Sequence, residues 1–301
     1  MTHAGFVTLV GKPNVGKSTL LNAMLESPVA PVSTRPQTTR RQLRGIYTHR
    51  DMQIVFVDAP GVHAPADRLD SYMQQQIHEA LEEVDLVLWV VDLRHPPTDE
   101  DAMVAHRLQS HPSPVWLIGN KLDAATRPDD AMAAYEALLP GRAQSRRLSA
   151  LDFPSVGLLR RELLEQLPEG PWMYPAETSG KSDQGPERWA GDMIRQAAME
   201  HLYQEIPYTL AVKVETLEKR KKHKPKPAEI MYCKATLIVE REAHKPIAIG
   251  HGGSMLKRIG RRARQLMEQL LGRQVYLDLE VRVYPNWRQD SEALRELEME
   301  Q

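Results

Sequence analysis

Short apolar runs alternate with amphipathic stretches through the first half of the chain. Five runs rich in Val, Ile and Leu have the length of buried strands and are predicted at residues 6–10, 53–57, 86–91, 115–119 and 146–148. Helical patterns begin near residues 17, 67, 99, 129 and 155. Strands that alternate with helices predict a mostly parallel sheet with helices on both faces. Residues 43–48 predict one further strand, paired antiparallel at an edge of that sheet.

The second half has a different order of elements. Residues 168–186 are rich in Pro, Gly and Ser and are predicted to be a linker. A helix is expected at 187–204, strands at 209–217 and 229–241 with a basic loop (219–227) between them, a short helical piece before Gly250, a helix at 254–271 and a strand at 275–283. The long helix carries an apolar stripe of Leu256, Ile259, Ala263, Leu266 and Leu270. The predicted domains are therefore 1–167, a linker 168–186, a second domain 187–290 and a polar tail 291–301.

Composition and charge change this picture in two ways. Of the 301 residues 42% are hydrophobic and 26% are charged, and the longest apolar run, 86–91, is too short to span a bilayer. With a single cysteine, Cys233, and no signal-like N-terminal region, we expect a cytoplasmic protein. Residues 1–180 carry 17 Lys and Arg against 22 Asp and Glu, whereas residues 219–264 carry 14 against 3. This basic block indicates either a nucleic-acid surface or a solvated face.

The segment GKPNVGKS follows the first strand and opens a helix, the context that a phosphate-binding loop requires. Its glycines allow backbone N–H groups to turn toward phosphate oxygens, and the helix N-terminus adds partial positive charge. Lys17 is expected to bridge the β- and γ-phosphates and Ser18 to bind Mg²⁺. The predicted nucleotide contacts are Gly11, Lys12, Pro13, Asn14, Val15, Gly16, Lys17, Ser18 and Thr19.

The segment DAPG ends the strand at 53–57. Asp58 can hold Mg²⁺ through water there, and the Gly61 N–H can meet the γ-phosphate. We expect nucleotide contacts from Asp58, Ala59, Pro60, Gly61 and Val62. Between the two motifs lies QTTRR (37–41), where a threonine can complete the Mg²⁺ shell when GTP is bound. Thr38 is favoured over its neighbour, and Lys17, Thr38 and Gly61 are the predicted catalytic groups.

The segment NKLD follows the strand at 115–119 and predicts guanine selectivity. A carboxylate at Asp123 accepts two hydrogen bonds that guanine offers and adenine does not. The Lys121 stem would pack on the base, and LSA (148–150) would supply backbone N–H groups for O6. The predicted contacts at this end are Asn120, Lys121, Leu122, Asp123, Ser149 and Ala150. Four elements at the carboxyl ends of successive strands define one nucleotide site.

The sequence lacks the usual residue that orients the attacking water. Many switch GTPases carry a water-orienting glutamine just after the D-x-x-G segment, but Val62 stands there. Charge on the β–γ bridge also requires a cation, and Asn14 is placed to ligate K⁺. The alternative is that Asn14 only stabilises the turn of the loop.

The second half carries a G-x-x-G turn, Gly250-His251-Gly252-Gly253, before the basic helix. Such a turn allows a nucleic-acid strand to approach the backbone closely, and the helix adds cations. The order helix–strand–strand–helix–helix–strand is that of a type II KH domain. The predicted RNA contacts are Gly250, His251, Gly252, Gly253, Lys257, Arg258 and Arg261.

Together these motifs resemble the Era family of GTPases. The resemblance includes GKPNVGKS, QTTR, DAPG, NKLD and LSA, and also ATLIVERE (235–242) and IGHGGSMLKRIG (249–260). It implies a GTPase that uses Mg²⁺, binds small-subunit (16S) rRNA near its 3′ end and acts in 30S subunit assembly, with weak peripheral affinity for the inner membrane. We expect a monomer. His251 and Gly252 stand where the family usually has lysine, so phosphate affinity would depend more on Lys257 and Arg258.

Two other interpretations stay open at this stage. A GTP-regulated membrane-surface protein could use the basic block on anionic lipid, although the block lacks the Trp/Phe/Leu face of an interfacial helix. A P-loop kinase or ATPase is disfavoured by residues 120–123.

Overall fold

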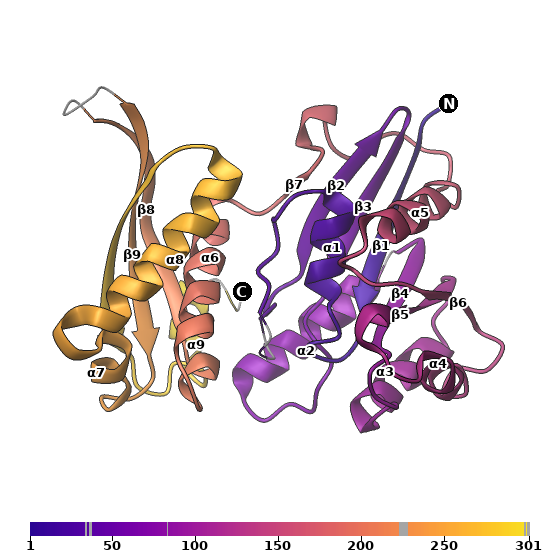
Figure 1. Cartoon of the computed structure of the whole chain (residues 1–301), viewed down its shortest axis with the longest axis horizontal. Helices are drawn as coiled ribbons and strands as arrows, with labels where there is room; N and C mark the ends of the chain where they lie inside the picture. The colour runs from indigo at the N-terminus through magenta and orange to yellow at the C-terminus, as the bar shows by residue number, and fades with distance from the viewer. Residues whose placement is uncertain (34, 36–37, 83, 223–227, 298, 300–301) are drawn as a thin grey trace. The chain divides into compact units, whose positions relative to one another are not determined.

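The computed structural model describes residues 1–33, 35, 38–82, 84–222, 228–297 and 299. Contacts between its residues divide the chain into two compact units (Figure 1). The first comprises Met1–Ala66 and Met73–Asp183, and the second comprises Asp67–Tyr72 and Gln184–Gln301. Each unit is described by itself below.

The first unit is built on a seven-stranded sheet in the order β6-β5-β4-β1-β3-β2-β7. β1 is parallel to both β3 and β4, and β5 and β6 continue the parallel series. β2 is antiparallel to β3, as predicted. The strands are β1 (His3–Val10), β2 (Leu43–His49), β3 (Met52–Asp58), β4 (Leu86–Asp92), β5 (Val115–Asn120), β6 (Ala143–Arg147) and β7 (Lys181–Ser182).

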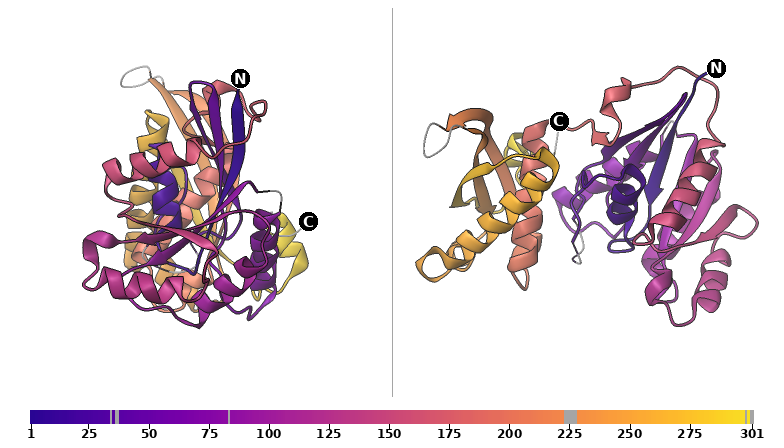
Figure 2. Two further views of the ribbon diagram at one scale, coloured as in Figure 1. Left: turned by 90° about the vertical axis from the view of Figure 1, so that its right-hand side faces the viewer. Right: turned by 45° about the horizontal axis from the view of Figure 1, so that its top comes forward.

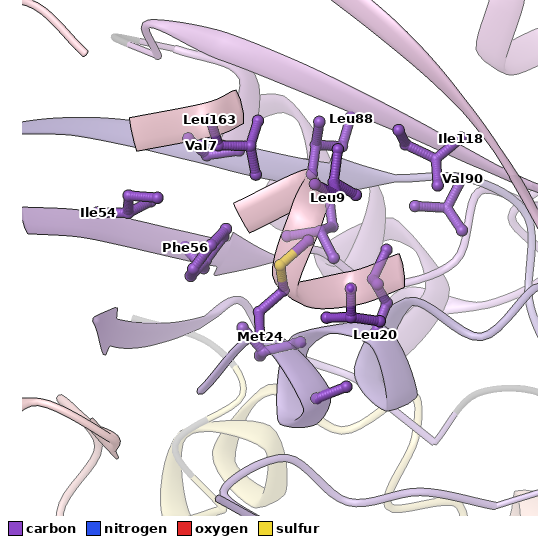
Figure 3. Packing of buried hydrophobic residues seen from close by; sticks show 14 of the residues in the cluster. Val7, Leu9, Leu20, Met24, Ile54, Phe56, Leu88, Val90, Ile118 and Leu163 are labelled. Carbon is purple, nitrogen blue, oxygen red and sulfur yellow. The ribbon is translucent and has the colours of Figure 1, made fainter. Parts of the chain in front are cut away.

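Helices cover both faces of this sheet, which confirms the predicted layers (Figures 1 and 2). The helices are α1 (Lys17–Leu25), α2 (Arg68–Leu81), α3 (Asp99–Gln109), α4 (Pro128–Glu136) and α5 (Phe153–Leu164). One core lies between the sheet and the pair α1 and α5, where Leu9, Phe56 and Leu88 pack against Met24 and Leu163 (Figure 3). The other core lies between the sheet and α2, α3 and α4. Because β1, β3, β4, β5 and β6 are parallel, their carboxyl ends lie at one edge of the sheet.

The stretch 168–186 is more ordered than a linker. It contains a short 3₁₀ turn, η2 (Ala176–Thr178), and β7, which pairs with β2. Gln53 is buried and accepts hydrogen bonds from the N–H groups of Met173 (2.9 Å) and Tyr174 (3.0 Å). Residues 168–183 therefore belong to the first unit, and β2 is not the edge strand that its sequence predicts. The Pro and Gly content of this stretch predicts a linker. The hydrogen bonds that order it join it to Gln53, about 120 positions earlier, so they could not be read from the local sequence.

The second unit is a three-stranded sheet, β10-β9-β8, with α6 and α8 side by side on one face (Figures 1 and 2). β8 is antiparallel to β9, and β9 is parallel to β10. The elements are α6 (Pro186–His201), β8 (Ala211–Lys222), β9 (Ala228–Val239), α7 (His244–Ile249), α8 (Ser254–Leu271), β10 (Val275–Val283) and α9 (Ser291–Glu296), with 3₁₀ turns η3 (Ile206–Tyr208) and η4 (His251–Gly253). The predicted order of elements is confirmed.

Three details of the second unit differ from the sequence predictions. β8 extends to Lys222, into the predicted basic loop (219–227), of which residues 223–227 lie outside the described residues. On α8 the core follows the row Ile259, Ala263 and Met267, whereas Leu270 is 37% exposed, so its predicted burial is wrong. The predicted polar tail contains α9, because Asp290 caps it by accepting hydrogen bonds from two N–H groups of its first turn and the Leu294 side chain is buried.

Candidate functional site

The phosphate loop lies between the end of β1 and the start of α1. Gly11 and Gly16 have φ angles of 152° and 98°, and Asn14 also has a positive φ of 63°. A Cβ on Gly11 would lie 2.3 Å from the Val90 carbonyl oxygen, and one on Gly16 would lie 2.4 Å from Asn120 Nδ2. The loop therefore requires glycine at both positions, for its backbone conformation and for its close packing.

Lys17 is buried inside the loop. Its Nζ donates hydrogen bonds to the carbonyl oxygens of Gly11 (3.0 Å) and Lys12 (3.1 Å). Burial lowers the pKa of Lys17 to about 8, and the nearby Asp58 carboxylate acts in the opposite direction. A cation held here, among backbone groups at a helix N-terminus, is suited to phosphate oxygens.

Oxygen atoms from three elements meet beside Lys17. Ser18 Oγ donates to Asp58 Oδ2 (2.6 Å) and lies 3.0 Å from Thr39 Oγ1, which is 3.2 Å from the same carboxylate oxygen. Burial raises the pKa of Asp58, against the opposing effects of Lys17 and the two hydroxyls. The other carboxylate oxygen, Oδ1, is buried without a hydrogen-bond partner. A buried carboxylate and two hydroxyls fit the oxygen donors that Mg²⁺ takes.

The threonine that lies at this cluster is not the predicted one. Thr38 Oγ1 donates to the Arg35 carbonyl at 2.9 Å, whereas Thr39 faces Ser18 and Asp58. The sequence contains two adjacent threonines, and the path of the backbone decides which hydroxyl faces Ser18 and Asp58. Gln37 lies outside the described residues.

The segment 59–62 packs directly against the phosphate loop. A Cβ on Gly61 would lie 2.7 Å from the backbone nitrogen of Pro13, and the Val62 N–H donates to the Gly11 carbonyl at 3.1 Å. The Val62 side chain is buried in the second core, so it cannot orient a water molecule. The next polar side chain is His63, whose Nδ1 lies 2.9 Å from the Gly61 carbonyl oxygen.

At the opposite end of the site, Asn120 connects two loops. Its Nδ2 donates to the Val15 carbonyl (2.8 Å), and its Oδ1 accepts from the Ala150 N–H (2.9 Å). The Ala150 N–H is therefore engaged within the protein, which differs from its predicted use by guanine O6. Leu122 and Asp123 are exposed in η1 (Leu122–Ala124). Ser149, the residue before Ala150, is buried.

Two aspartates outside the predicted motifs also contact this region. Asp92, at the end of β4, lies 2.8 Å from Lys121 Nζ, and Asp101, in α3, lies 2.6 Å from Lys12 Nζ. No short motif includes them. Their position after a buried strand and in the first turn of the following helix was the only signal in the sequence.

The glycine turn of the second unit has no side chains at three of its four residues. Gly250, Gly252 and Gly253 all have positive φ angles, and a Cβ on Gly250 would lie 2.7 Å from the Met255 nitrogen. Gly253 precedes α8 without any side-chain cap, so the first N–H groups of that helix have no side-chain acceptor at the N-cap position. His251 is exposed in the same turn.

The basic side chains of α8 divide into two groups. Lys257, Arg258 and Arg261 are exposed, as is Arg264. Arg262 instead forms an ion pair with Glu200 of α6, with Nε 2.6 Å from Oε2. The predicted RNA contacts Lys257, Arg258 and Arg261 thus lie on the part of α8 that follows the glycine turn.

Comparison with known proteins identifies a family for each of the two units. Residues 6–121 match the family described as 50S ribosome-binding GTPase, and residues 205–288 match the KH domain family. GTPase Era of Deinococcus radiodurans is 50% identical over an alignment of 302 positions, gaps included. The alignment covers 98% of this chain and 94% of that protein. GTPase Era of Lacticaseibacillus paracasei is 40% identical over 298 residues, with 98% and 96% covered. This chain belongs to the Era family of GTPases.

Solved structures of Era show the same fold over the whole chain. One is Era in complex with MgGDPNP and nucleotides 1506–1542 of 16S ribosomal RNA, and another is a variant of Aquifex aeolicus Era bound to GDP and AlF₄⁻. Each is 32% identical, has a TM-score of 0.91 and covers 100% of both chains. The chain is thus a GTPase with a P-loop GTPase domain and a KH domain. Among the described residues, no helix is both long enough and apolar enough to cross a bilayer.

Proposed function

We propose that this Era-family GTPase binds the 3′ end of small-subunit rRNA through its KH domain and uses GTP binding and hydrolysis to control that contact during 30S assembly. A 32% identical Era of the same fold is complexed with MgGDPNP and nucleotides 1506–1542 of 16S rRNA, which supports this proposal. The relatives and solved structures give no support to the membrane-surface alternative. Affinity for the inner membrane and a monomeric state stay predictions.

One observation of this chain carries the RNA proposal: a three-glycine turn with positive φ angles leads into the exposed cations of α8. Glycines allow a single strand to approach the backbone, and the uncapped helix start adds partial positive charge where a phosphate would lie. Lys257, Arg258 and Arg261 would then neutralise neighbouring phosphates, so their contribution to affinity should depend on salt.

RNA binding to an oligonucleotide of the 16S 3′ end tests the proposal. Replacing Lys257, Arg258 and Arg261 with Ala should weaken binding and flatten the dependence of log K on log salt by up to about two to three units of slope. The matched control replaces Lys213, Lys234 and Arg282, three basic residues on strands β8, β9 and β10, and changes the net charge equally. If both variants lose the same affinity, the contact is with net charge and not with this face of α8.

At the nucleotide, we infer that Ser18 and Asp58 hold Mg²⁺ and that Thr39 joins them when a γ-phosphate is present. Mg²⁺ supplies charge stabilisation on the phosphates when it is bound. The orphaned Asp58 Oδ1 and the two converging hydroxyls support this ligand set. The capture of Thr39 when GTP is bound, and its release after hydrolysis, would couple the loop that carries it to the state of the nucleotide.

The other predicted roles stay proposals of the same kind. Asp123 would accept from the guanine base, with the Lys121 stem beside it, and Lys17 and the Gly61 N–H would meet the transferred phosphate. Asn14 would hold a K⁺ ion between the phosphates, which supplies the cation that the sequence lacks at that point. The positive φ of Asn14 fits either this role or a simple turn.

A further inference from the structure

The phosphate loop is held from the side by an ion pair outside the nucleotide site. Lys12 Nζ lies 2.6 Å from Asp101 Oδ2 and 3.2 Å from Thr98 Oγ1, both at the start of α3. The Asp101 side chain is fully buried and that of Lys12 is 14% exposed. The Lys12 side chain thus extends from the phosphate loop to the first turn of α3.

A second ion pair reaches the same loop two residues later. Lys121 Nζ donates to the Asn14 carbonyl oxygen (2.5 Å) and to Asp92 Oδ2 (2.8 Å). Asp92 is itself fixed by Arg94, whose Nε lies 3.0 Å from Oδ1 and whose Nη2 lies 2.8 Å from Oδ2. Asp92 and Asp101 belong to one stretch of chain, the end of β4 and the start of α3.

We propose that this stretch acts as a brace: Asp101 through Lys12, and Asp92 through Lys121, hold residues 12–14 of the phosphate loop in the position that GTP hydrolysis requires. The two contacts flank Pro13, against which Gly61 packs closely. A shift of residues 12–14 would therefore move Gly61 relative to the phosphates. Asp92 and Asp101 are positioning residues in this proposal, since they act through the lysines.

Asp101 also has an ordinary structural role that the test must separate. Its Oδ2 accepts from the Thr98 N–H (2.8 Å) and completes a capping box at the start of α3. The cap affects the stability of α3, and Lys12 contacts its two groups, Thr98 Oγ1 and Asp101 Oδ2, without being one of them. Changing Lys12 removes the brace and leaves both capping side chains in place, whereas changing Asp101 affects the brace and the cap.

The experiment measures single-turnover GTP hydrolysis with the full-length protein in excess over GTP and at a concentration well above its Kd, so that weaker binding does not slow the observed rate. Lys12→Met and Asp101→Asn should each slow this step by roughly 10- to 100-fold, the range that a misplacement of about 1 Å can cause. The double variant, which leaves no unpaired buried charge, should be no slower than the slower single variant, because both changes break one contact. Asp92→Asn should slow the same step.

Asp99→Asn is the matched control, since Asp99 is an exposed carboxylate in the same first turn of α3. It should hydrolyse GTP at the wild-type rate. If a single variant does not fold, the double variant decides. A folded double variant with the wild-type single-turnover rate overturns the proposal, and so does a loss of thermal stability in Asp101→Asn with no change in rate, which would mean that Asp101 is only a helix cap.

Discussion

At the residue scale, Thr38 and Thr39 are neighbours in the sequence with hydroxyls in different surroundings. Thr39 lies at Ser18 and Asp58, while Thr38 donates to a carbonyl within its own loop. Thr39→Ala should slow GTP hydrolysis by roughly 10- to 100-fold, since one hydrogen-bonded ligand contributes about 1–3 kcal/mol, and should leave GDP affinity nearly unchanged. Thr38→Ala is the control and should stay within a few-fold of wild type. Steady-state hydrolysis and GDP titration of both variants check this, and the reverse order of effects would restore the prediction made from the sequence.

Asn14 is the candidate residue for holding a cation near the β- and γ-phosphates. Its side chain can hold K⁺, or its positive φ can serve only the turn of the loop. We predict that hydrolysis is faster in K⁺ than in Na⁺ at equal ionic strength and that Asn14→Ala removes the difference. An arginine finger at an equivalent place contributes roughly 10³–10⁵ in rate, which sets the upper limit of the effect. Equal rates in the two salts would exclude the ion and leave GTP binding unaffected.

Asp123 carries the prediction of base choice. Its carboxylate is exposed at the mouth of the site, where guanine N1–H and N2–H can donate to it. Asp123→Asn should weaken GTP binding by on the order of 100-fold, because two bonds to a charged acceptor are lost, and should improve binding of xanthosine triphosphate. Competition binding measures both. Asp130→Asn, an exposed carboxylate in the following helix, should change neither affinity, and a similar loss in that variant would point to general electrostatics instead.

At the element scale, the stretch 168–183 depends on one buried amide. Gln53 receives two backbone N–H groups from residues 173 and 174 and donates to the Tyr174 carbonyl (2.8 Å) and to Thr48 Oγ1 (3.0 Å). Gln53→Met keeps the size but removes the amide from these half-buried partners, so it should cost about 1–3 kcal/mol of unfolding free energy.

Hydrogen exchange of residues 172–183 in Gln53→Met distinguishes local from global loss. We expect faster exchange there than in β3 itself, because β3 pairs with both β1 and β2, whereas β7 lies at the end of the strand order beside β2. Gln75→Ala, on the exposed surface of α2, is the control for loss of an amide side chain. Unchanged protection of 172–183 would show that the stretch is held without the Gln53 amide.

At the scale of the whole molecule, the apolar clusters of the two units share no residue among those described. A ligand stabilises only the part that must be folded to bind it. We predict two unfolding transitions in calorimetry: a GTP analogue with Mg²⁺ should raise only the first unit's transition and the RNA oligonucleotide only the second's. At 100 times Kd each shift corresponds to about 2.7 kcal/mol. A single transition that both ligands shift would show that the two cores unfold together.

Local rules in the sequence determined most of this protein. Apolar runs defined the strands, because a strand buried on both faces is apolar along its length, as β4 is up to its last residue, Asp92. Glycine positions 11 and 16 were readable because only glycine fits those backbone angles and contacts. Motifs at the ends of β1, β3 and β5 located one nucleotide site, since the carboxyl ends of parallel strands meet at one edge.

Tertiary structure decided what no local rule contains. Which of two adjacent threonines faces Asp58 depends on the path of a loop between distant anchors. The ordering of residues 168–183 depends on Gln53, about 120 positions away, and the pairing of Lys12 with Asp101 joins positions 89 apart. A hydrogen bond or ion pair depends on distance in space, to which sequence separation gives no guide. The fold and the meeting of the sequence motifs at one edge of the sheet were therefore predictable from the sequence, and the contacts between distant residues were not.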